Sequence, residues 1–304
     1  MQEISQGSYP FALSDDPREL HAYLAWREQR LGAYPASIDD LRVELTALAT
    51  PSSGERGAIT RRVAAYGMAL VAAPPNQITP EGITAFGRAL GLKTADSNLF
   101  ADHRAISTIT AGGTDDRVDY IPYTAKALSW HTDGYYNAPG AQVRAWTLFC
   151  VRPAAAGGAN SLLDPEVAYI HLRDQSPELI RALIHPQAFT IPANIQSGKV
   201  LRAESTGPVF SFNQGVLHMR YSARGRNVVW RATPETGAAR EALDRLFSSP
   251  ASYIFTHTLQ AGEGFVTNNV LHNRTGFEDA GGSGEGRLLY RVRYLEGVNP
   301  RSLG

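Results

Sequence analysis

The chain has 304 residues, and its 29 lysines and arginines balance its 29 aspartates and glutamates. A net charge near zero, without a basic run, does not favour nucleic acid or an anionic membrane surface as a partner. The single cysteine, Cys150, excludes an internal disulfide framework and a four-cysteine zinc site, and this is typical of a reducing compartment. No stretch approaches about 18 uninterrupted apolar residues, so we expect a cytoplasmic protein without a membrane span.

The N-terminal quarter of the chain is expected to be helical. Apolar residues recur at roughly helical spacing from residue 16 to residue 29. Ser37 is a plausible N-cap for a second helix, and residues 57–67 are predicted to form a third, which leads into a short strand at 69–72. We therefore expect residues 1–75 to form a helical region that packs on the core of the protein.

The remainder of the chain, residues 76–304, is expected to be rich in β-strands. Thr79, followed by Pro80 and Glu81, predicts a helix with Thr79 as its N-cap that ends before Gly91. Strands are expected at 143–151, 263–272 and 287–294, and helices at 165–173 and 235–247. Many short strands between glycine and proline turns favour a barrel or a double-sheet jelly roll, interrupted by a mixed insert at about 175–250.

The segment His131-Thr132-Asp133 contains the one His-x-Asp or His-x-Glu pattern among the eight histidines. Residues two apart on an extended segment point the same way, so an imidazole and a carboxylate can reach a single ion. A third ligand, His272, is available far downstream. Two histidines and one carboxylate on one face leave the opposite metal positions open, which is typical of non-haem Fe(II) oxygenases.

Arg287 begins the last predicted strand and could bind the cosubstrate that supplies electrons to such an iron centre. Cleavage of O₂ needs two electrons beyond those of the substrate, and 2-oxoglutarate can supply them by oxidative decarboxylation. While its C1 end chelates the metal, its C5 carboxylate needs a fixed cation, and arginine offers a bidentate fork. Asn160 and Ser161 are candidates for one further hydrogen bond to that carboxylate.

Several segments together resemble the TauD/TfdA family of Fe(II)/2-oxoglutarate-dependent dioxygenases, which includes taurine dioxygenase and γ-butyrobetaine hydroxylase. The resemblance runs from about residue 58 to residue 297. Its most specific pieces are His131-Thr132-Asp133, Gly157-Gly158-Ala159-Asn160, Leu271-His272-Asn273-Arg274 and Arg287-Leu288-Leu289-Tyr290-Arg291. The resemblance implies a mainly β fold with flanking α-helices, in which residues 76–304 form a double-stranded β-helix, or jelly roll.

By position, the resemblance also implies the roles of individual residues. His131, Asp133 and His272 would hold Fe(II), and Arg287 would hold the C5 carboxylate of 2-oxoglutarate. Asn160 falls where many members have a threonine that contacts 2-oxoglutarate. Arg291 matches a second family arginine that meets an anionic substrate and lies near the cosubstrate. Arg293 should share the strand face of Arg291 and competes with it for this role.

Other residues are candidates for the substrate pocket. Trp130, Tyr135 and Tyr136 flank the ligand pair, where aromatic rings could pack in the core or form a substrate wall. Aromatic faces also attract quaternary ammonium groups. Tyr221, with the neighbouring residues Arg220 and Arg224, lies in a segment that resembles the γ-butyrobetaine hydroxylase branch and is expected near the substrate.

The sequence therefore predicts an oxygenase that uses Fe(II), 2-oxoglutarate and O₂ and hydroxylates a small, polar, anionic molecule, with release of succinate and CO₂. Hydroxylation, desaturation and cleavage are all open as outcomes. A trimethylammonium substrate is the alternative within this class, and a non-catalytic jelly-roll protein that binds a small molecule or metal is an alternative outside it. A zinc hydrolase with the same three ligands is a further alternative. The family implies a homodimer or homotetramer.

Overall fold

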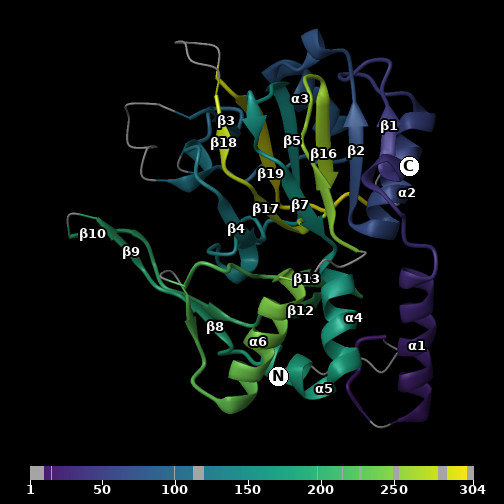
Figure 1. The fold of residues 1–304 in the computed structure, drawn as a ribbon, viewed down its shortest axis with the longest axis vertical. Coiled ribbons are helices and arrows are strands. Elements are labelled where there is room, and N and C mark those ends of the chain that lie inside the picture. The colour runs from purple at the N-terminus through teal and green to yellow at the C-terminus, as the bar shows by residue number, and fades with distance from the viewer. Residues whose placement is uncertain are drawn as a thin grey trace. The chain divides into compact units, whose positions relative to one another are not determined.

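A computed structural model describes residues 10–14, 16–98, 100–111, 120–196, 198–213, 215–225, 228–248, 253–279 and 286–299 (Figure 1). The chain folds into two compact units. The first, here called the sheet unit, comprises Pro35–Asp164, Arg220–Val228 and Ile254–Gly304. The second, the helix-rich unit, comprises Met1–Tyr34, Pro165–Met219 and Val229–Tyr253. The expected helical region at 1–75 thus has parts in both units, and the expected insert at 175–250 has most of its residues in the helix-rich unit.

The sheet unit contains a six-stranded sheet. In spatial order, its strands are β1 (Arg42–Glu44), β2 (Met68–Ala72), β16 (Glu263–Thr267), β5 (Ala145–Arg152), β19 (Leu288–Tyr294) and β3 (Ile106–Ile109). The β1–β2 pair is parallel, and every other pair in this sheet is antiparallel. The long central strand β5 lies between β16 and β19, and its burial explains the apolar run that the sequence shows there.

Two helices, α2 (Ser53–Tyr66) and α3 (Pro80–Ala89), cover one face of this sheet (Figure 1). Both begin at an N-cap, because the hydroxyls of Ser52 and Thr79 accept hydrogen bonds from backbone N–H groups in the first turn. The buried side chains of this layer include Ile59, Val63, Ile83, Phe86, Val71, Phe149, Val266 and Val292. Each large apolar side chain buried in this way contributes about 1.5–3 kcal/mol, so the layer fixes which face of each strand remains for the site.

The opposite face of the six-stranded sheet meets a second, antiparallel sheet. Its strands, in spatial order, are β15 (Phe255–His257), β7 (Asn160–Leu163), β17 (Leu271–Arg274) and β4 (Leu128–His131). The ring of Trp146 on β5 lies 4.6 Å from the ring of His272 on β17. His257 Nε2 on β15 is 2.7 Å from Glu263 Oε2 on β16. The inner faces of the two sheets therefore enclose a common interior.

Shorter elements complete the sheet unit. The two-residue strands β6 (Ala156–Gly157) and β18 (Phe277–Glu278) pair with each other. Single 3₁₀ turns are η1 (Ile38–Leu41), η2 (Pro75–Gln77), η4 (Ile121–Tyr123) and η5 (Pro139–Ala141). The helix predicted to begin at Ser37 has Ser37 as its N-cap, but it is a single 3₁₀ turn, η1, after which the chain enters β1. Pairing of β1 with the buried strand β2 outweighs the local helix signal.

The helix-rich unit contains four of the helices and three small sheets. Its helices are α1 (Pro17–Leu31), α4 (Pro165–Gln175), α5 (Pro177–Leu183) and α6 (Pro234–Ser248). One sheet has the order β11 (Ser205–Gly207), β8 (Phe189–Ile191) and β14 (Val229–Trp230). The other two are the hairpins β9 (Asn194–Gln196)–β10 (Lys199–Arg202) and β12 (Phe210–Asn213)–β13 (Val216–Met219). The predicted β core with flanking helices is confirmed. In the described parts of the chain, no helix is both long and apolar enough to cross a membrane.

Candidate metal centre and its surroundings

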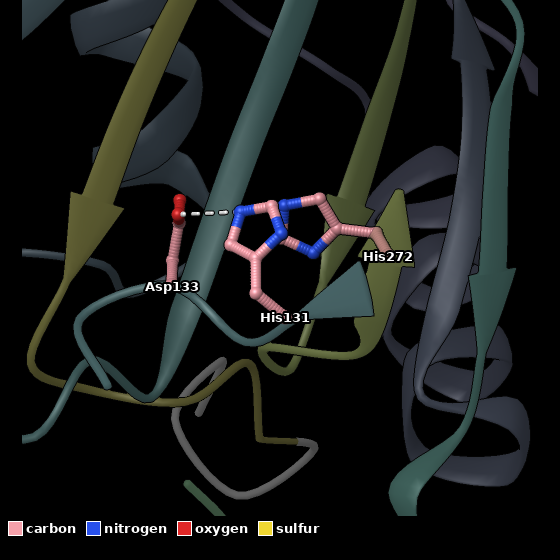
Figure 2. A group of neighbouring side chains, drawn as sticks. All are labelled: His131, Asp133 and His272. Atoms are coloured by element: carbon pink, nitrogen blue, oxygen red, sulfur yellow. Dashed lines mark ion pairs between the residues drawn. The ribbon is translucent and has the colours of Figure 1, made fainter. Parts of the chain in front are cut away.

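The structure brings together the three residues that the sequence predicts as metal ligands. His131 ends β4, Asp133 follows two residues later, and His272 on β17 pairs directly with His131 across the sheet. One ligand atom from each side chain lies within 4.8 Å of the others, and all three residues are buried. Figure 2 shows the two rings and the carboxylate converging on one spot. Strand register, rather than proximity in sequence, creates this cluster.

Both imidazoles are held in the form that can bind a metal. Nδ1 of His131 donates to the carbonyl of Ser129 at 2.8 Å, and Nδ1 of His272 donates to the carbonyl of Val270 at 3.0 Å. Because a carbonyl only accepts, each Nδ1 carries the proton and each neutral ring presents an unprotonated Nε2. Burial lowers the pKa of His131 to about 3 and also lowers the pKa of His272. Both rings are therefore neutral near pH 7.

Asp133 completes the donor set and has one unsatisfied oxygen. Its Oδ1 accepts from Arg291 Nη1 at 3.2 Å and lies 3.8 Å from His131 Nε2. Burial is the largest single influence on Asp133 and by itself raises its pKa, but the charges of Arg291 and of its other neighbours, Arg293 among them, together outweigh it, so the net pKa is lowered and the group is ionised. Oδ2 is buried and has no hydrogen-bond partner among the described residues. A buried, unpartnered carboxylate oxygen is costly, and a divalent cation bound by two imidazoles and this carboxylate would satisfy it.

Asn269 holds Asp133 in place, and sequence reasoning missed it. Its Oδ1 accepts from the backbone N–H of Asp133 at 2.8 Å. Its Nδ2 donates to the carbonyls of Asp133, at 3.0 Å, and Val143, at 2.8 Å. The residue has a left-handed backbone with φ of 54°, which asparagine tolerates better than most residues. Its position three residues before His272, in the turn that precedes β17, was the available signal.

Two of the aromatic residues predicted to line the substrate pocket, Tyr135 and Tyr136, lie near the candidate metal ligands. The ring of Tyr135 is 6.4 Å from that of His131, and Tyr136 contacts Tyr135 edge-on at 5.2 Å. The hydroxyl of Tyr136 accepts from Arg293 Nη1 at 2.6 Å, and Arg293 also forms an ion pair with Asp96. Arg293 is therefore engaged in holding this loop.

Trp130 and Tyr221 do not share the face of the metal ligands. Trp130 precedes His131 on β4, so its side chain points to the opposite face of the sheet. Tyr221 precedes Ser222, which pairs with His131, and its side chain points the same way as that of Trp130. Both are buried. These two side chains therefore belong to the packing on the other face of the sheet.

Arg287 is buried next to the glycine turn that carries Asn160. Its side chain is 5% exposed, its guanidinium lies 4.9 Å from the ring of Phe277, and Gly158 lies beside its Nε. The backbone N–H of Arg287 donates to Asp279, but its guanidinium has no hydrogen bond or ion pair within the described parts of the chain. Burial lowers its pKa to about 10, which still leaves it charged near pH 7. A buried guanidinium that forms no ion pair within the described ranges suits an anionic ligand.

Asn160 shares the interior with Arg287. It lies opposite Arg274 on β17, and its Nδ2 donates to the carbonyl of Gly158 at 3.4 Å. Because His272 and Arg274 are two residues apart on β17, Asn160 points to the same face as His272. Arg274 itself donates to the backbone carbonyls of Thr124 and Lys126, a structural role. The structure therefore places both Asn160 and Arg287 next to Gly158.

Comparison with known proteins agrees with this geometry. Residues 30–293 match the model of the "Taurine catabolism dioxygenase TauD, TfdA family". A "Uridine-5'-phosphate dioxygenase" from Amycolatopsis sp is 30% identical over 178 residues, which are 57% of this chain and 62% of that protein. A "Uridine-5'-phosphate dioxygenase" from Streptomyces sp is 29% identical over 235 residues, which are 70% of this chain and 81% of that protein.

A solved structure is similar in fold. It is that of asparagine oxygenase in complex with Fe(II), 2S,3S-3-hydroxyasparagine and succinate, with a TM-score of 0.60 and 16% identity. The match covers 84% of this chain and 93% of that one. At this identity the likeness concerns the fold, whereas the family match spans most of the chain and confirms the family that the sequence motifs indicate. The chain belongs to the TauD/TfdA family of dioxygenases.

Proposed function

We propose that this protein is an Fe(II)/2-oxoglutarate-dependent dioxygenase that hydroxylates a small, polar, anionic substrate. One observation carries the proposal: two neutral imidazoles converge with a carboxylate that has an unpartnered oxygen among the described residues, and the same unit buries Arg287, whose guanidinium forms no ion pair in those ranges. The two facing, mainly antiparallel sheets support a double-stranded β-helix as the core of the sheet unit. A dimeric or tetrameric state and a cytoplasmic location stay predictions.

The chain's own residues would prepare the reactants. Fe(II), when bound, supplies a site at which O₂ is activated while 2-oxoglutarate is decarboxylated. His131 and His272 would bind it through Nε2, with their rings held by backbone carbonyls, and Asp133 would bind it through Oδ2. The guanidinium of Arg287 would bind the C5 carboxylate of 2-oxoglutarate by two parallel hydrogen bonds, with Asn160 nearby. The buried interior would exclude water from the reacting atoms.

The proposed reaction accounts for both oxygen atoms of O₂. One oxygen atom of O₂ enters the substrate C–H bond as a hydroxyl group, and the other enters succinate as 2-oxoglutarate loses CO₂. Arg291 would hold Asp133 in its ionised form through the observed ion pair. The names of the two relatives make uridine-5'-phosphate the first substrate candidate, because it is small, polar and anionic. The trimethylammonium alternative loses one of its three aromatic groups, since Trp130 points away from the ligands.

An anaerobic titration with Fe(II) and 2-oxoglutarate tests the cofactor and cosubstrate. We expect the weak visible metal-to-ligand charge-transfer band of the chelated complex, and no band in His131→Ala. In Arg287→Ala the band should require about 10-fold or more 2-oxoglutarate, because a charge-assisted hydrogen bond is worth about 1.5–3 kcal/mol. Arg240→Ala is the control, since its side chain is 54% exposed and lies on α6. Absence of a band, together with tight Zn(II) binding, would instead support the hydrolase alternative.

A further inference from the structure

The segment 220–224 adds an edge to the four-stranded sheet beside the ligands. Ser222 forms an antiparallel bridge with His131. The backbone N–H of Thr132 donates to the carbonyl of Tyr221 at 3.0 Å, and that of Ala223 donates to the carbonyl of Trp130 at 2.8 Å. Ser222 and His131 therefore form a non-hydrogen-bonded pair, in which side chains lie close together on one face.

Alternation then places two arginines on the metal side of this edge. Arg220 and Arg224 are each two residues from Ser222, so their side chains start on the face that carries His131. Arg220 is 7% exposed, and its Nε donates to the carbonyl of Tyr135 at 2.7 Å, which places its guanidinium by the loop after Asp133. Ser222 is 2% exposed. Two cationic side chains and a hydroxyl thus start from the edge that pairs with His131.

Arg224 has an unused hydrogen-bond donor. Its Nη2 is buried and lacks a hydrogen-bond partner, and no carboxylate in the described ranges forms an ion pair with it. A buried guanidinium N–H without an acceptor costs about 1–3 kcal/mol or more, because it has lost its hydration. The interior therefore favours an acceptor that arrives with the substrate. Arg287 is a different cation, which lies beside Gly158.

We propose that Arg224, with Arg220 and Ser222, forms the subsite for the phosphate group of the primary substrate. The inference rests on the proposed function and specifies its substrate class as a phosphate monoester. Two guanidinium groups match the two negative charges of a phosphate monoester, and a guanidinium fork and a hydroxyl match its several oxygens. A phosphate bound there lies next to His131, so the carbons nearest the phosphate are those presented to the metal.

Binding measurements on the anaerobic complex with Fe(II) and 2-oxoglutarate test this subsite. Uridine-5'-phosphate and uridine are titrated separately, with the shift of the charge-transfer band and calorimetry as readouts. We expect the wild type to bind the phosphate at least 10-fold more tightly than uridine. Arg224→Ala should lose that difference while it retains its affinity for uridine and 2-oxoglutarate, and Arg224→Lys should fall between the two. The control Arg240→Ala should match the wild type, and thermal melting checks that each variant is folded.

The failure of this inference is distinguishable from failure of the proposed function. A normal charge-transfer band with equal binding of uridine-5'-phosphate and uridine, or equal losses for both in Arg224→Ala, overturns the phosphate subsite and leaves the oxygenase intact. If no band forms, calorimetry with inorganic phosphate on the metal-free protein still tests the subsite. Phosphate binding that Arg224→Ala weakens at least 10-fold supports it, and no binding, or binding that the variant leaves unchanged, overturns it.

Discussion

At the scale of single residues, the candidate site depends on side chains that hold other side chains. Asn269 satisfies both backbone groups of Asp133 with one amide and binds Val143 as well. The carbonyls of Ser129 and Val270 fix the orientation of the two imidazoles. Such supporting hydrogen bonds set ligand geometry, and their loss typically costs 10–100-fold in metal affinity. Asn269 is therefore a positioning residue for Asp133.

Comparison of Asn269→Gly with Asn269→Ala separates the effect of the lost hydrogen bonds from the effect of the left-handed backbone. Asn269→Gly keeps the left-handed backbone but leaves three buried groups unpaired, so we expect a loss of about 2–4 kcal/mol in the free energy of unfolding. Asn269→Ala should lose about 1 kcal/mol more, from the positive φ. Urea unfolding and Fe(II) titration measure the two effects, with Asn194→Ala on β9 as the control. Wild-type Fe(II) affinity in Asn269→Gly would show that the amide does not position Asp133.

At the scale of the element, β19 divides its side chains between two layers. Tyr290, Val292 and Tyr294 face the layer of α2 and α3, where the latter two are buried in the core. The alternate residues Arg291 and Arg293 face the second sheet, and both are anchored to carboxylates. Arg291 pairs with the candidate ligand Asp133, whereas Arg293 pairs with Asp96 and donates to Tyr136. Two arginines on one strand face thus serve different partners.

Arg293→Met should destabilise the protein through Asp96. The substitution leaves a carboxylate whose side chain is 15% exposed without its cation, and breaking such a buried pair costs about 3–5 kcal/mol. The double variant Asp96→Asn/Arg293→Met should be less destabilised than Arg293→Met alone. Denaturant unfolding checks both, against Arg240→Met on the exposed face of α6. A loss in Arg293→Met that the double variant does not relieve would assign the effect to packing.

At the scale of the whole molecule, the two buried imidazoles make stability depend on pH. In the folded protein burial lowers the pKa of His131 to about 3 and lowers that of His272, whereas the ordinary value is 6.5. Below about pH 6.5 the unfolded chain takes up protons on these rings and the folded, metal-free protein does not. The free energy of unfolding therefore falls as the pH falls.

The metal-free protein should lose stability between pH 7 and pH 5 more steeply than a variant without one of these rings. For a histidine that is neutral when folded and protonated when unfolded, the slope approaches about 1.4 kcal/mol per pH unit. His131→Asn should accordingly show a shallower acid limb, whereas the control Arg240→Ala, on the exposed face of α6, should keep the wild-type slope. Urea unfolding in the presence of a chelator measures each. Parallel curves for wild type and His131→Asn would mean that the imidazole is protonated in the folded state.

The sequence by itself determined the chemistry of the centre, because that chemistry requires particular residue types at particular spacings. Strand alternation makes His131-x-Asp133 a ligand pair, and the arginine at 287 is readable from the needs of a dicarboxylate cosubstrate. Local signals such as the N-cap at Thr79 also determined helices. The N-cap signal at Ser37 produced only one 3₁₀ turn, because the chain then pairs with β2 as β1.

The tertiary structure alone decided which faces meet. The pairing of Ser222 with His131 joins segments about ninety residues apart, and no local pattern specifies it. That pairing puts Arg224 on the strand face of His131 and Tyr221 and Trp130 on the other face, and a register shift of one residue would reverse both. The hydrogen bonds between Asn269 and the backbone of Asp133 likewise form only once β17 and β4 have paired. The chemistry of the ligand atoms follows from residue types, whereas the direction of each side chain depends on the register between strands that are far apart in the sequence.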